Sequence, residues 1–183
     1  MNRRAVVVLL LLSGCSFFSK TKNNIYSLDR IPGTPVAARG TPLAIESLEL
    51  PPDVDRREIV VRKVDHLLDV RSNELWSADL KPLVLHTLAF DLASRLPEGM
   101  VILPGQTVPA AMRPIDVVFE ELAAGPDQKV VLDARWKLDN ITHHETIAVD
   151  IPSLDSKSVA AGMSQAVAQL AERIAAVDAG QIR

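Results

Sequence analysis

The segment RPIDVVFEELAAGPDQKVVLDARWKLDN (Arg113–Asn140) has the strongest strand pattern of the 183-residue chain. Ile115, Val117 and Phe119 share one face before the turn sequence AAGPDQ. After the turn, apolar and charged residues alternate from Val130 to Asp139. Because successive strand side chains point to opposite faces, this pattern predicts a long antiparallel hairpin with one packed face and one hydrated face.

The regions around this hairpin combine helical periodicity with short apolar runs. Leucines recur every three or four residues from Leu85 to Leu96, and a longer amphipathic stripe covers residues 155–177. Ser77 or Asp79 is the expected N-cap of the first helix. Further short strands are expected at residues 25–30, 43–50, 58–64, 66–71, 100–104 and 146–151.

These elements predict a single α/β domain over residues 25–183. Strands followed by helices that can each bury one face favour a mixed β-sheet of about six strands with two main helices packed on it. The long antiparallel hairpin near residues 113–140 forms part of that sheet. A chain of this length is within the range of one domain that buries its own core.

The N-terminus has the layout of an export signal. Arg3 and Arg4 precede the apolar run Ala5–Leu12. This run is much shorter than a membrane-spanning helix, which needs about 20 apolar residues. The small residues Ser13 and Gly14 follow. The segment therefore predicts a signal peptide that is removed rather than a permanent anchor.

The cleavage site resembles the bacterial lipobox, in which a cysteine is lipidated and becomes the first residue of the mature chain. Leu12-Ser13-Gly14-Cys15 has this form, and Cys15 is the only cysteine of the chain. We expect residues 1–14 to be a lipoprotein signal peptide and residues 15–24 to be the lipidated N-terminus and tether. A covalent diacylglycerol and an N-acyl chain on Cys15 would anchor the protein stably, because a single acyl chain binds a membrane only reversibly and two or more bind it stably.

The residue after the lipidated cysteine sorts such lipoproteins between the two membranes. Signals of this kind retain proteins with Asp at that position, and here it is Ser16. We therefore expect an outer-membrane lipoprotein that faces the periplasm and needs no other cofactor. A formal net charge of −3 and an aromatic content of 4% argue against nucleic-acid binding.

No constellation of residues predicts catalysis. His143, His144 and Glu145 are metal-ligand types, but neighbours on an extended chain point apart, so solvated turn residues are expected and no metal site. Ser164 lies within a helical stripe, lacks the second glycine of a nucleophile elbow, and is expected on the surface. We expect no catalytic residue and no enzymatic activity.

The two tryptophans are costly residues that favour either a core position or an interface. A core position is favoured for Trp136, which alternates with charged residues on the hairpin's return strand. Trp76 precedes the first helix, and both alternatives stay open for it.

Several motifs follow one another through nearly the whole chain. They are the lipobox, Tyr26-Ser27-Leu28, LELPPDVDRREIVVR (Leu48–Arg62), Trp76 and VVLDARWKL (Val130–Leu138). In their order and spacing these motifs resemble the ABC-type transport auxiliary lipoprotein family. The sequence departs from the family where it has Val54-Asp55-Arg56, since the family often has an aromatic residue or leucine before Asp-Arg, and where Trp76 lacks the following Glu-Pro.

The resemblance implies a docking subunit that supports envelope integrity. Its partners would be an MCE-domain protein, a permease and an ATPase that together move lipid between the inner and outer membranes. Tyr26, Asp55, Arg56 and Trp76 are the candidate partner-binding residues. A homo-oligomer would strengthen a weak contact through avidity. The alternative function is a periplasmic carrier of lipid or another small ligand, which requires a large apolar pocket with a few convergent polar groups.

Overall fold

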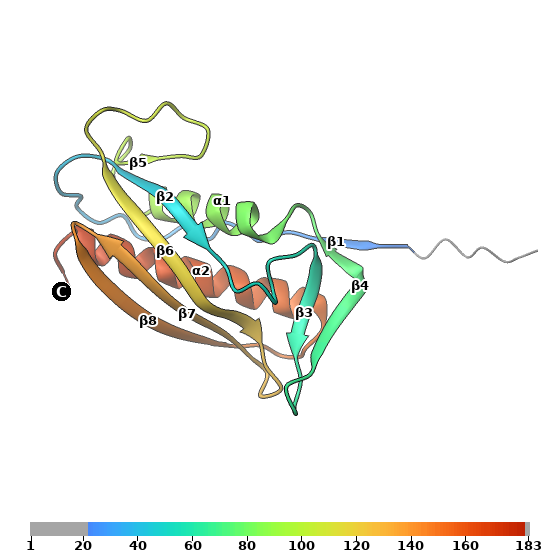
Figure 1. Cartoon of the computed structure of the whole chain (residues 1–183). Coiled ribbons are helices and arrows are strands. Elements are labelled where there is room, and N and C mark those ends of the chain that lie inside the picture. Colours follow the sequence, from blue (N-terminus) through green and yellow to red (C-terminus); the bar gives the residue numbers. More distant parts are fainter. Residues whose placement is uncertain (1–21, 182–183) are drawn as a thin grey trace, which may run out of the picture.

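The computed structural model describes residues 22–181, which form eight strands and two helices (Figure 1). The expected signal peptide and the predicted lipidation site at Cys15 lie outside the described residues. The elements follow in the order β1 (Asn24–Tyr26), β2 (Leu43–Glu49), β3 (Glu58–Arg62), β4 (Leu68–Trp76), α1 (Leu80–Ala93), β5 (Val101–Ile102), β6 (Arg113–Ala124), β7 (Lys129–Leu138), β8 (Ile141–Asp150) and α2 (Ser156–Asp178).

The strands form one mixed sheet around β6. β2 pairs with β6 in parallel, β7 pairs with it in antiparallel orientation, and β8 continues antiparallel to β7. β5 lies parallel to β2 at one end. At the other end, β3 joins β6 through Val61 and Ala124, β4 is antiparallel to β3, and β1 is parallel to β4. Both helices cover one side of this sheet (Figure 1), and the expected α/β class is confirmed.

The predicted hairpin forms the centre of the core. Every second residue of β7 is buried, including Val130, Leu132 and Trp136, as the alternation predicts. α2 lies so close to β7 that a Cβ atom at Gly162 would be 2.7 Å from Cγ2 of Val130. Only glycine permits this separation between the helix and the sheet.

The connection from β1 to β2, residues 27–42, is held by polar side chains of the helices. Asp29 donates its backbone N–H to Ser164 Oγ at 3.0 Å, and Ile31 donates to Asp91 Oδ1 at 2.7 Å. Ser164 is 1% exposed, so the expectation that it lies on the surface is wrong. Its hydroxyl is buried because it accepts this backbone donor.

The third strand of the hairpin region begins earlier than expected. β8 starts at Ile141, not at residue 146, and places His143, His144 and Glu145 inside a strand where a turn was expected. The pairing of all ten β8 residues with β7 outweighs their polar composition. The first helix also differs in detail, since Asp79 is its N-cap residue but its side chain accepts no capping hydrogen bond.

Candidate functional site

Three segments that the sequence analysis proposed for partner binding lie together in the structure. Tyr26 of β1 is in register with Trp76 of β4. The N–H of Trp76 donates to the carbonyl of Arg57 at 2.7 Å, and the N–H of Ser77 donates to the carbonyl of Tyr26 at 2.7 Å. These bonds join β1, the turn at residues 51–57 and the end of β4, and we call this region the Trp76 end.

The members of the Trp76 end differ in exposure. The side chain of Trp76 is 1% exposed and belongs to the core, which supports the core alternative for this residue. Tyr26 is half-buried, whereas Asp55 and Arg56 are exposed. Arg56 lies 3.8 Å from the Glu58 carboxylate, as measured from Nε to Oε2. The surface of this region therefore comes from the turn and from Tyr26, while Trp76 supports them from within.

A shallow, open cleft of about 550 Å³ adjoins Tyr26, and charged side chains lie along it. The hydroxyl of Tyr26 hydrogen-bonds to the Glu74 carboxylate, and this bond raises the pKa of Tyr26. The same bond, together with a 2.8 Å bond from Asn24 Nδ2, lowers the pKa of Glu74. At neutral pH the cleft therefore presents an ionised carboxylate beside a protonated phenol.

The far wall of the cleft is the N-terminus of α2. Arg71 donates to Ser156 Oγ at 2.8 Å and to the Leu154 carbonyl at 2.6 Å. Asp155 caps the helix by accepting the N–H of Ser158. Hydrogen bonds from Ser153 and Ser158 lower the pKa of Asp155 to about 2. Arg71, Glu74 and Asp155 are therefore all engaged in hydrogen bonds within the domain, which hold these charged groups in fixed positions along the cleft.

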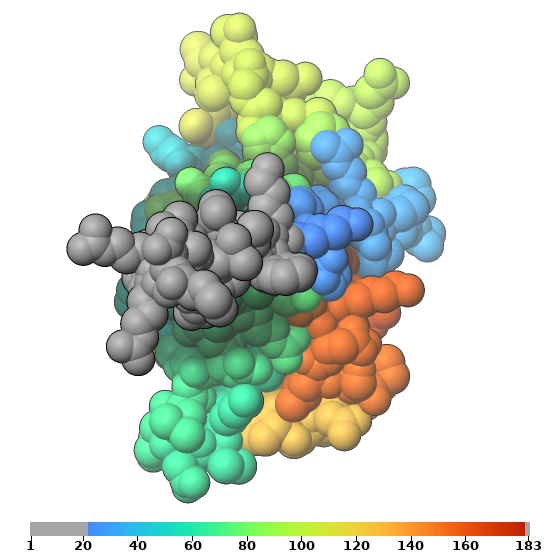
Figure 2. Space-filling model, turned by 90° about the vertical axis from the view of Figure 1, so that its right-hand side faces the viewer, coloured from blue at the N-terminus to red at the C-terminus, as the bar shows by residue number. Residues whose placement is uncertain are grey.

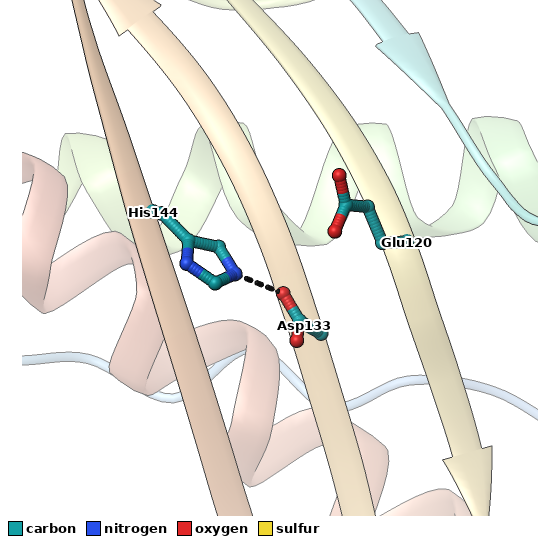
Figure 3. Close-up of side chains that lie close together, drawn as sticks. All are labelled: Glu120, Asp133 and His144. Carbon is teal, nitrogen blue, oxygen red and sulfur yellow. Dashed lines mark hydrogen bonds and ion pairs between the residues drawn. The ribbon is translucent and has the colours of Figure 1, made fainter.

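A second cluster lies on the hydrated face of the sheet. Ligand-type atoms of Glu120, Asp133 and His144 all lie within 4.8 Å of one another (Figure 3). His144 Nε2 is 2.6 Å from Asp133 Oδ1, and Arg135 Nε donates to Glu120 at 2.6 Å. Each of the three side chains therefore already has a partner within the sheet, and the cluster is a set of exposed cross-strand pairs.

This cluster was not expected from the sequence, where the metal-ligand types considered were the adjacent residues His143, His144 and Glu145. His143 instead stacks on the buried Trp136 ring, with centroids 4.1 Å apart and an interplanar angle of 17°. His144 points to the other face. Glu120 lies on the same face as Val118, two residues earlier in β6, and follows Phe119, which pairs with Ala134 next to Asp133 in β7. Strand alternation predicts which face each of these side chains occupies, but the register that brings β6, β7 and β8 together here has no local signal.

Among residues 22–181, neither helix combines the length and the apolar composition that crossing a bilayer requires.

The chain matches the model of one protein family over most of its length. The model of the ABC-type transport auxiliary lipoprotein component matches residues 26–175, from β1 to the last turns of α2. The chain belongs to this family, which consists of transport auxiliary lipoproteins rather than enzymes.

Individual relatives are more distant. The chain is 27% identical over 137 residues to the intermembrane transport lipoprotein PqiC of Escherichia coli, with 73% of this chain and 72% of the relative covered. The PqiC of Shigella flexneri matches equally. A crystal structure of an uncharacterized protein aligns with a TM-score of 0.69 at 18% identity, covering 84% of this chain and 97% of the other. A Xanthomonas campestris protein aligns with a TM-score of 0.66 at 16% identity, covering 86% and 97%. These two likenesses show the fold.

Proposed function

We propose that this protein is a docking subunit of an ABC-type system that moves lipid between the inner and outer membranes. Cys15 carries the lipid anchor in the outer membrane, and the domain faces the periplasm. The Trp76 end receives an MCE-domain protein of the transporter. Family membership supports the transport role, and the name of the PqiC relatives, intermembrane transport lipoprotein, supports the path between membranes.

The observation that carries the proposal is the convergence at the Trp76 end. Tyr26 pairs with Trp76, and Arg57, which directly follows the exposed pair Asp55 and Arg56, also bonds to Trp76. Two hydrogen bonds hold the turn against the end of β4. One runs from the Trp76 N–H to the Arg57 carbonyl, and the other from Arg57 Nη2 to the Trp76 carbonyl at 3.3 Å. A surface held by a buried tryptophan and carrying charges of both signs is suited to specific, reversible protein contact.

In-cell photocrosslinking tests this proposal. A photoreactive amino acid at position 55 or 56 should capture the MCE-domain protein, because these side chains are exposed on the docking surface. Val118 is the control position, since it is 46% exposed on the outer face of β6. Replacement of Cys15 by alanine should reduce capture at equal periplasmic amounts, because the untethered domain loses its local concentration at the membrane.

Two outcomes would contradict the proposal. Capture of the MCE-domain protein from Val118 but not from positions 55 and 56 would place docking on another face. A stoichiometric lipid that co-purifies with the protein, without any captured transporter subunit, would favour the carrier alternative.

A further inference from the structure

The hairpin formed by β3 and β4 ends in an apolar tip. Four side chains within seven residues are exposed, and they account for half of the exposed large hydrophobic side chains among the described residues. The four are Val64 (63% exposed), Leu67 (61%), Leu68 (41%) and Val70 (42%). The hairpin projects beyond the body of the domain (Figure 2, teal-green). An exposed group of this kind marks a contact with a partner or a membrane.

The tip closes in a tight turn. Asp65 and His66 adopt φ angles of 59° and 61°, and Leu67 donates its N–H to the Val64 carbonyl at 3.3 Å. Leu67 precedes β4 and lines one hollow together with Leu68, so the two leucines form one exposed apolar edge at the end of the hairpin. A membrane surface that meets the end of the hairpin would cover this edge and the neighbouring Val64.

We propose that this tip enters the phospholipid bilayer that carries the Cys15 anchor, and so gives the domain a second membrane contact that sets its orientation. The inference rests on the lipid anchor of the proposed function. It goes beyond that function because the anchor alone leaves the domain free to rotate at the end of its tether.

The length of the tether is compatible with this contact. Asn24, where the described β1 begins, pairs with Glu74 of β4. From Glu74 to Leu67 the strand covers at most about 23 Å at 3.3 Å per residue. Residues 15–23 span at most about 30 Å when fully extended. A bilayer that holds the lipid on Cys15 can therefore reach the tip of the hairpin.

The charges at the tip give it no positive excess that would attract anionic lipid. Lys63 Nζ lies 3.6 Å from Asp69, and the formal charge that remains at the turn is that of Asp65. Insertion that depends on apolar burial should therefore occur in zwitterionic and in anionic vesicles alike.

Fluorescence of the full-length lipoprotein in vesicles tests the inference. The chain has one cysteine, Cys15, whose sulfur is occupied by lipid, so a Leu67→Cys variant has one free thiol for a nitrobenzoxadiazole label. Ile141→Cys is the matched control, because Ile141 is 59% exposed and begins β8 at the far end of the sheet (Figure 1). The vesicles contain phosphatidylethanolamine and phosphatidylglycerol, and flotation measures anchoring separately.

The expected result is a blue shift at position 67, loss of quenching by aqueous iodide and quenching by spin-labelled lipid, with none of these at position 141. In a chain labelled through Val64→Cys, Leu67→Asp should restore iodide quenching, and Ile141→Asp should leave protection unchanged. If the protein floats but the label at 67 behaves like that at 141, the hairpin inference is overturned and the anchor stands. Protection that appears only after an MCE-domain protein is added assigns the tip to that protein and also overturns the inference. If the protein does not float, the Cys15 anchor fails and the hairpin inference fails with it.

Discussion

Two hairpins of this protein have their turns at the same end of the sheet, but one buries its apolar side chains and the other exposes them at its tip. β3 and β6 run in parallel, so the β3–β4 tip and the β6–β7 tip lie near each other (Figure 1). The β6–β7 hairpin buries alternate residues and turns through Gly125, Pro126, Asp127 and Gln128, which are usual turn residues. The β3–β4 hairpin turns through Asp65 and His66 and exposes large apolar side chains on either side.

The difference shows that location alone does not make a turn polar. Both tips are reached by strands of one sheet, and both are open to solvent in the isolated domain. An apolar tip in this position adds nothing to the core of the domain and exposes surface that favours association. Its sequence is therefore explained by a contact outside the domain, whereas that of the β6–β7 hairpin is explained by folding.

The largest expected effect is a difference between the two hairpins in how much an alanine replacement lowers the free energy of unfolding. Leu132→Ala in β7 should lower the free energy of unfolding by about 2–5 kcal/mol, because Leu132 is fully buried and leaves a cavity. Leu67→Ala should change it by less than about 0.5 kcal/mol, because the side chain is already in water. Urea denaturation of both variants measures the two values. A loss of similar size for Leu67→Ala would mean that the tip belongs to the fold and is not reserved for a contact.

A pH series should change global stability without changing either hairpin. Burial raises the pKa of Asp91 on α1 to about 6, against a hydrogen bond from Ile31 that lowers it. The folded protein therefore holds this proton more tightly than the unfolded chain does. Stability should rise as the pH falls from 7 to 4, by up to about 3 kcal/mol for a shift of about two pH units.

The Asp91→Asn variant isolates this contribution. The amide keeps an acceptor for the Ile31 N–H but cannot ionise, so the unfolding free energy of the wild type should rise relative to that of the variant on acidification. Denaturation curves at pH 7, 6 and 5 measure that difference. A difference that stays constant with pH would show that Asp91 does not titrate in this range. A change in the fluorescence of a label at position 67 over the same pH range would show that the hairpin is coupled to α1.

The smallest expected effect concerns the turn of the β3–β4 hairpin. Two non-glycine residues with positive φ are costly, and Asn-Gly is the preferred pair at such positions. The double replacement Asp65→Asn and His66→Gly should therefore stabilise the domain, by about 1 kcal/mol or less. Thermal unfolding measures this gain. Because the apolar side chains remain, protection of a label at Leu67 in vesicles should persist, and its loss would assign the contact to the turn residues.

Much of the fold followed from local patterns, and the candidate site did not. The alternation in residues 113–140 predicted the long hairpin, and the helical stripes at residues 85–96 and 155–177 predicted α1 (Leu80–Ala93) and α2 (Ser156–Asp178). The burial of Ser164 was missed, because its partner Asp29 is distant in the sequence. The extension of β8 to Ile141 was missed as well, since the pairing with β7 and not the composition of the strand determines it.

The sequence by itself determined the periods of the strands and helices, the resemblance to a transport auxiliary lipoprotein and the expectation of a lipid at Cys15. These properties depend on neighbouring residues, whose spacing is visible in a linear chain. Only the tertiary structure decided that Tyr26 and the turn at residues 51–57 meet around a buried Trp76. Only the tertiary structure likewise left Leu67 in solvent while Leu132 entered the core. Burial and contact between distant segments depend on how the elements pack, and side chains of equal hydrophobicity do not reveal beforehand which of them packing will cover.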